Sequence, residues 1–189
     1  MTLENDIDPT AFGFAKMKYA AIERERRWLC DKMPEIAASA SETYLIDDLY
    51  ITGTQLRLRD VTDPDGAPVW PRLTRKVEID ASHRLITSIY LDKAELELFR
   101  HLPGQHVQKT RTVVMVSDQR MAVDAFTGTL QGLILAEAEF ADDEAMNAFS
   151  PPRWVTREVT HEPLFSGGNL SALSEEAAKT LVRRLFDGN

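Results

Sequence analysis

Pairs of like charges separated by one residue recur along this sequence and indicate a binding site for a charged ligand. The pairs are Arg57 and Arg59, Lys109 and Arg111, and Glu137 and Glu139. Unit charges ~4 Å apart interact by about 4 kcal/mol at an effective dielectric of about 20, so cations grouped inside a protein need an anion among them. Grouped carboxylates need cations in turn, and the hard ions Mg²⁺ and Mn²⁺ prefer oxygen ligands. A cation-lined side and a metal-binding side together would suit a triphosphate.

Each pair taken alone has a simpler explanation. The charges could lie on the solvent side of a half-exposed sheet, where a cross-strand ion pair contributes well under ~1 kcal/mol. The segment around Glu137 and Glu139 argues against that explanation, because two leucines precede the glutamates on the same face. One face therefore changes from apolar to acidic along its length, which a solvated face does not require.

The charge pairs fall on short segments with period-two alternation, which predict a mostly β fold between residues 43 and 140. We expect antiparallel strands over residues 55–59, 71–77, 84–91, 107–116, 120–126 and 133–140. Closing this sheet into a barrel would turn the charged faces inward. The segment 17–30 is ambiguous, because propensity alone predicts a helix while residues 23–27 also alternate.

Three helices are expected to pack outside the sheet. Asp92 can cap a helix over residues 93–101, and Asp142 and Asp143 can open a short helix that ends at residues 151–152. The amphipathic stretch 174–186 belongs to a C-terminal helix expected over residues 171–187. Residues 1–16 are expected to be a loose N-terminal segment, and the whole chain, 1–189, a single domain.

Composition limits the partners of the protein. The 189 residues carry 22 Lys and Arg against 30 Asp and Glu, a formal net charge of −8, which disfavours a nucleic-acid or anionic-membrane binder. No segment approaches the roughly 20 apolar residues of a membrane helix. Cys30 is the only cysteine, so no intrachain disulfide is possible and we expect a cytoplasmic protein. A homodimer is compatible with the base rates for soluble proteins.

Short motifs follow one another in a fixed order from about Tyr19 to Leu173. The early motifs are Glu23-Arg24-Glu25-Arg26-Arg27, Leu56-Arg57-Leu58-Arg59, Leu73-Thr74-Arg75-Lys76 and Lys109-Thr110-Arg111. The later motifs lie at residues 123–128, 132–140 and 152–160. Each motif is common by itself, but their order and spacing resemble the CYTH superfamily, the triphosphate tunnel metalloenzymes. The resemblance favours a strand rather than a helix for residues 23–27, because the family opens with an E-x-E-x-K strand.

The resemblance implies an α+β, mostly β fold, in which an eight-stranded antiparallel β-barrel forms a triphosphate tunnel with helices packed outside. It implies that phosphate oxygens are held by Arg27, Arg57, Arg59, Lys76, Lys109 and Arg111. It implies a metal site of Glu23, Glu25, Glu137 and Glu139, and catalytic roles for Glu23, Glu25 and Asp124. Arginine suits the phosphate contacts because its planar fork binds bidentately. Arg27 replaces the family's lysine, which keeps the charge and changes its geometry.

The expected reaction is hydrolysis of inorganic triphosphate, or of a nucleoside or thiamine triphosphate, with Mg²⁺ or Mn²⁺. One alternative is a class IV adenylate cyclase, which makes cyclic AMP from ATP. Another is a polyphosphate- or nucleotide-binding module without catalysis. This last alternative rests on a departure from the family, since Ile86 and Ser88 stand where many members carry two glutamates. Their loss puts a second metal ion in doubt.

Overall fold

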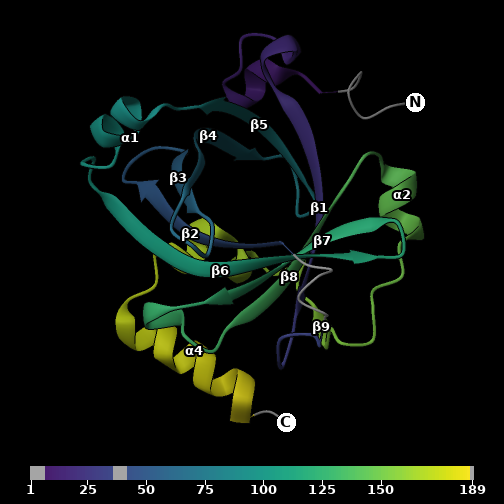
Figure 1. Ribbon diagram of the computed structural model, residues 1–189. Helices are drawn as coiled ribbons and strands as arrows, with labels where there is room; N and C mark the ends of the chain where they lie inside the picture. Colours follow the sequence, from purple (N-terminus) through teal and green to yellow (C-terminus); the bar gives the residue numbers. More distant parts are fainter. Residues whose placement is uncertain (1–6, 36–41, 188–189) are drawn as a thin grey trace.

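The computed structural model describes residues 7–35 and 42–187, and its main element is a closed barrel of antiparallel strands (Figure 1). The strands are β1 (Ala21–Leu29), β2 (Glu42–Ile51), β3 (Leu56–Thr62), β4 (Pro68–Glu78), β5 (His83–Tyr90), β6 (Gly104–Val116), β7 (Gln119–Phe126) and β8 (Ile134–Phe140). They are hydrogen-bonded in the order β5-β4-β3-β2-β6-β7-β8-β1, and pairing of β1 with β5 closes the barrel. A short strand, β9 (Arg157–Glu158), pairs with the end of β1. The expected eight-stranded antiparallel barrel is confirmed.

Strand β1 shows why propensity alone was misleading. The helix that propensity predicts over residues 17–30 is wrong: a single 3₁₀ turn covers Met17–Tyr19, and an extended strand follows. Both edges of β1 are hydrogen-bonded, one to β5 and the other to β8. Its alternation places Glu23, Glu25 and Arg27 on the inward face and Trp28 on the outward face. Tertiary pairing and side-chain placement therefore outweigh the small differences in intrinsic helix propensity.

Strand β2 has no counterpart among the strand bounds expected from the sequence. It pairs with β3 on one side and with β6 on the other, so it lies in the middle of the sheet. The acidic doublet Asp47-Asp48 obscures its alternation, because one aspartate faces outward while Asp48 points into the barrel and is buried. A buried carboxylate on a central strand is rare unless it is paired.

The apolar clusters fill one end of the barrel interior and cover the outer faces of its strands. One cluster packs Leu133 and Leu135 against Leu170 of α3 (Gly167–Ser171) and Leu181 of α4 (Glu175–Asp187). A second cluster joins the outer faces of β1, β7 and β8 to α2 (Asp143–Ala148) around Trp28. Figure 1 shows α4 lying along the outside of the barrel. No helix in the described part of the chain is long and apolar enough to cross a membrane.

The helices begin where the sequence predicts, except for the C-terminal helix. Asp92 forms a capping box with Glu95 at the start of α1 (Lys93–Phe99), and Asp142 caps α2. The C-terminal helix starts at Glu175 rather than at residue 171, because α3 ends at Ser171 and Ser174 accepts a hydrogen bond at the start of α4.

Residues 1–16 are expected to be loose, but their described part is packed against the barrel. A 3₁₀ helix, Pro9–Phe12, leads to Phe14, which is buried against Val77 and Leu85 on the outer face of β4 and β5. The guanidinium of Arg75 lies 4.4 Å from the centre of the Phe14 ring. The apolar contact and the cation–π contact fix this segment on the barrel. Residues 1–6 lie outside the described part.

Candidate active site

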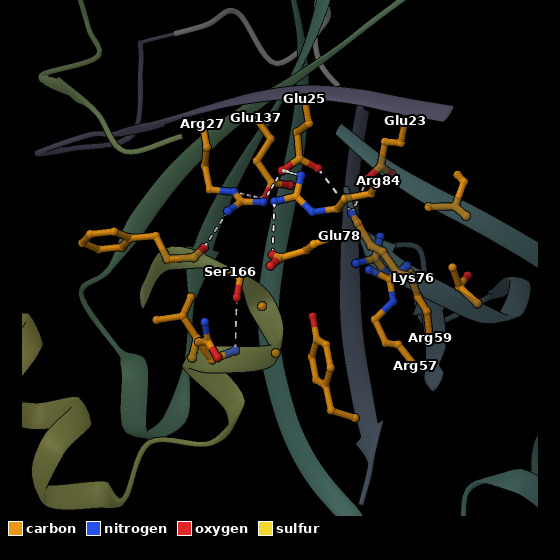
Figure 2. Close-up of a pocket in the computed structure, with 18 of the residues that line it drawn as sticks. Glu23, Glu25, Arg27, Arg57, Arg59, Lys76, Glu78, Arg84, Glu137 and Ser166 are labelled. Carbon is orange, nitrogen blue, oxygen red and sulfur yellow. Dashed lines mark hydrogen bonds and ion pairs between the residues drawn. The ribbon is translucent and has the colours of Figure 1, made fainter. Parts of the chain in front are cut away.

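The inward-facing residues of the barrel line a cavity of about 480 Å³ (Figure 2). With the exception of Asp124, every site residue expected from the sequence lines it, namely Glu23, Glu25, Arg27, Arg57, Arg59, Lys76, Lys109, Arg111, Glu137 and Glu139. In Figure 2, Glu23, Glu25 and Arg27 project from one strand, while the basic residues labelled on the other side come from β3 and β4. The period-two alternation of the strands therefore collects charges from distant parts of the sequence in one place.

Three carboxylates form the acidic part of the cavity. Glu23 and Glu25 on β1 and Glu139 on β8 each place one oxygen within 4.8 Å of the others. The backbone register places Glu25 directly opposite Glu139. Partial burial, together with the charges of Glu23 and Glu25, raises the pKa of Glu139 above its ordinary value. Clustered oxygen ligands that repel one another fit a hard divalent cation such as Mg²⁺ or Mn²⁺.

Glu137, expected as a fourth ligand, lies apart from this group and is held by two arginines. It accepts hydrogen bonds from Arg27 Nε at 3.0 Å and from Arg111 Nη2 at 2.9 Å. Burial alone would raise the pKa of Glu137, but Arg27 and the other nearby cations outweigh it and hold this pKa well below its ordinary value. The cause is register, because Arg27 stands opposite Glu137 across the β1–β8 pair.

Arg27, expected to bind phosphate, has most of its donors occupied by the protein itself. Besides Glu137, it forms an ion pair with Glu25 and donates to the carbonyl oxygen of Phe165 at 3.1 Å. The side chain is buried, and the charges of Glu25 and Glu137 outweigh the effect of burial and raise its pKa. In this structure Arg27 orients the two glutamates.

Two further cations approach the acidic cluster from β4 and β5. Lys76 forms an ion pair with Glu23, and its Nζ lies 3.4 Å from Glu25 Oε2. The guanidinium of Arg84 is buried, with Nη1 3.6 Å from Glu25 Oε1, and this nitrogen has no hydrogen-bond partner within residues 7–35 and 42–187. Sequence analysis missed Arg84 as a site residue. Arg84 begins the strand motif in which Ile86 and Ser88 replace the two glutamates of many family members.

A buried aspartate on β2 holds the basic residues of β3. Asp48 accepts two hydrogen bonds from Arg59, at 2.6 and 2.7 Å, and its Oδ1 lies 3.6 Å from Arg57 Nε. Burial alone would raise the pKa of Asp48, but Arg59 and Arg57 outweigh it and lower this pKa. The Arg57 Nε is buried without a hydrogen-bond partner in the described part of the chain. Sequence analysis missed Asp48. Its spacing of two residues from Tyr50 was the feature that could have indicated that both lie on one face of a strand.

Asp124, expected to be catalytic, is fully buried beneath two cations and does not line the cavity. Both of its oxygens accept hydrogen bonds, from Lys109 Nζ at 2.5 Å and from Arg111 Nε and Nη2 at 2.7 Å each. Burial would raise the pKa of Asp124, but Arg111 and Lys109 hold it below its ordinary value. The geometry makes Asp124 a positioning residue for these two cations.

The departure at residues 86 and 88 lies inside the cavity. Ile86 and Ser88 both line it, opposite Lys76 and Thr74 across the β4–β5 pair. The hydroxyl oxygens of Ser88 and Thr74 lie 2.8 Å apart. The β5 wall therefore presents a methyl-bearing side chain and a hydroxyl where the family motif has carboxylates, and the acidic cluster is confined to β1 and β8.

Comparisons with known proteins agree with this architecture. No family model matches the chain. An 85-residue segment, 44% of this chain, is 35% identical to the inorganic triphosphatase of Nitrosomonas europaea, of which it covers 56%. A 64-residue segment, 34% of this chain, is 36% identical to the inorganic triphosphatase of Acetivibrio thermocellus, of which it covers 40%. The chain thus spans about half the length of the curated relatives it matches.

The fold comparison extends over more of the chain. The crystal structure of the inorganic triphosphatase NE1496 matches with a TM-score of 0.57 and 27% sequence identity. The match covers 80% of this chain and 95% of that one, so it includes nearly the whole of the relative's chain. The closed eight-stranded topology, the inward charges and these similarities support the resemblance of the chain to the CYTH superfamily of triphosphate tunnel metalloenzymes.

Proposed function

We propose that this protein hydrolyses the terminal phosphoryl group of a triphosphate inside the barrel, with a divalent metal ion held by Glu23, Glu25 and Glu139. The observation that carries the proposal is the presence, in one cavity, of an acidic cluster on β1 and β8 and of basic residues on β3, β4 and β6. Inorganic triphosphatases among the similar proteins support the same reaction and favour inorganic triphosphate as substrate.

The basic residues bind and orient the phosphate chain. Arg57 is the best placed for direct contact, because Asp48 is already engaged by Arg59 and leaves the Arg57 guanidinium incompletely paired. Lys109 and Arg111 present further donors to the cavity, and Asp124 beneath them keeps both in position. Preorganised cations of this kind stabilise the charge on equatorial phosphate oxygens without reorganising during the reaction.

The carboxylates complete the site on the opposite side. A divalent ion bound by Glu23, Glu25 and Glu139 would supply Lewis-acid neutralisation of the phosphate charge. Arg27 fixes Glu25 through an ion pair and joins it to Glu137, so these carboxylates keep one orientation. Mg²⁺ and Mn²⁺ both suit this set of oxygen ligands, and both belong in the assay.

The test is phosphate release from inorganic triphosphate, ATP and thiamine triphosphate, each with Mg²⁺ and with Mn²⁺. We expect release from inorganic triphosphate, and Glu139→Gln should reduce it by on the order of 100-fold. Glu97→Gln, an exposed glutamate on the outer helix α1, is the matched control and should keep full activity. Absence of release from all three compounds would contradict the proposal.

The same samples separate the two alternatives by their products. Cyclic AMP and pyrophosphate from ATP, identified by mass spectrometry, would make the protein an adenylate cyclase. Triphosphate binding without any product would identify a binding module, in keeping with the loss of carboxylates at Ile86 and Ser88.

A further inference from the structure

Arg72 on β4 is a cation inside the barrel that the proposed reaction does not use. It shares the inward face of β4 with Thr74 and Lys76, and the register places it between Arg59 on β3 and Tyr90 on β5. The residue is partly buried. Within residues 7–35 and 42–187 its guanidinium has no ion pair and no hydrogen bond, so its donors face the cavity unpaired.

The charges that act most strongly on Arg72 are of its own sign. Burial, followed by the charges of Arg59 and Arg57, lowers the pKa of Arg72, and Arg111 acts in the same direction. Arg59 and Arg111 each have a bidentate aspartate, Asp48 and Asp124 respectively, whereas Arg72 has none. A desolvated guanidinium among other cations is unfavourable unless an anion lies beside it.

Arg72 also stands where the tunnel continues past the acidic cluster. It lines the cavity of about 480 Å³ and a second cavity of about 470 Å³. The residues that line both are four arginines and two glutamates: Arg59, Arg72, Arg111, Arg120, Glu137 and Glu139. Along β4, Lys76 is four positions after Arg72, which is about 13 Å at ~3.3 Å per residue. Lys76 contacts Glu23 and Glu25, so Arg72 lies farther along the barrel from these two carboxylates, toward the exposed Trp70 that lines the second cavity.

On the basis of the proposed function, we propose that Arg72 determines the length of phosphate chain that the tunnel binds. It holds one further phosphate group beyond the three beside the basic residues and the acidic cluster. Besides triphosphate, the tunnel accordingly binds linear polyphosphates of four or more phosphates, which extend through the junction of the two cavities and gain the contact with Arg72.

The test is equilibrium binding of pyrophosphate, triphosphate and tetraphosphate, measured by calorimetry in EDTA so that turnover does not interfere. The wild type should bind tetraphosphate more tightly than triphosphate. Arg72→Met should weaken tetraphosphate binding by about 10-fold or more, since a charge-assisted contact is lost. It should have a smaller effect on triphosphate and none on pyrophosphate. Arg72→Lys should recover part of the affinity for tetraphosphate.

Controls keep this inference distinct from the proposed function. Arg100→Met removes an exposed arginine outside the barrel and should leave all three affinities unchanged. An equal loss for all three chain lengths, or no loss at all, would contradict the role of Arg72 while leaving the triphosphate site intact. A wild type that binds none of the three compounds would contradict the proposed function itself. Urea unfolding of Arg72→Met, expected to give an unfolding free energy equal to or higher than that of the wild type, shows that affinity changes do not reflect misfolding.

Discussion

The two walls of the tunnel balance their charges differently. On the wall formed by β6, β7, β8 and β1, each strand's cations meet carboxylates: Asp124 holds Lys109 and Arg111, and Glu137 links Arg111 to Arg27. On the wall formed by β3 and β4, the cations outnumber the carboxylates. Arg57 and Arg59 share Asp48, and Arg72 has no acidic partner among the described residues.

This difference separates a structural task from a binding task. The balanced wall is neutralised within the protein, so its side chains are held in place before any ligand arrives. The basic wall keeps an excess of positive charge that a bound anion can neutralise, which is the property of a phosphate site. Substitutions that break the buried ion pairs of the first wall should therefore affect folding as well as binding, whereas substitutions of the incompletely paired cations on the second should affect affinity.

The largest effect is expected from Asp124→Asn on the balanced wall. This change leaves Lys109 and Arg111 buried without their carboxylate, and breaking a buried ion pair typically costs about 3–5 kcal/mol of unfolding free energy. Urea denaturation followed by circular dichroism measures the loss. Asp118→Asn, in the exposed turn between β6 and β7, is the control that should not change stability. An unfolding free energy equal to that of the wild type would show that pairing does not organise this wall.

Arg57→Met tests whether a residue of the basic wall contributes to binding without contributing to stability. Triphosphate binding should weaken by about 10- to 100-fold, because a charged donor to phosphate is lost. The unfolding free energy should stay the same or rise, since the buried Arg57 Nε has no hydrogen-bond partner in the described part of the chain. Calorimetry and urea denaturation of the same sample give both values. A destabilisation as large as that expected for Asp124→Asn would remove the distinction between the walls.

The smallest effect concerns the pH dependence of the acidic cluster. Because the folded state raises the pKa of Glu139, it binds this proton more tightly than the unfolded chain does. Without metal, the contribution of Glu139 to stability should therefore decrease as pH rises from the ordinary glutamate value through the raised pKa. The difference in Tm between the wild type and Glu139→Gln, measured in EDTA from acidic to neutral pH, should show this decrease. A difference that does not vary with pH would contradict the repulsion among Glu23, Glu25 and Glu139.

Part of the fold could be predicted from the sequence. Alternation identified six of the barrel strands in outline, and Asp92 and Asp142 marked the helix starts correctly. Strand β1 needed the family resemblance, because its composition favours a helix. Strand β2 was not given bounds, because the paired aspartates within it resemble an exposed turn until Asp48 is seen to be buried.

The sequence by itself determined which side chains face the inside of the barrel, because alternation in a strand depends only on local geometry. The tertiary structure decided which of these charges meet. Glu137 and Glu139 look equivalent in the sequence, yet register places one opposite Arg27 and the other opposite Glu25. Asp48 and Arg72 acquire their roles in the same way, from neighbours on other strands. Such pairings depend on the stagger with which the barrel closes, and no single strand contains that information.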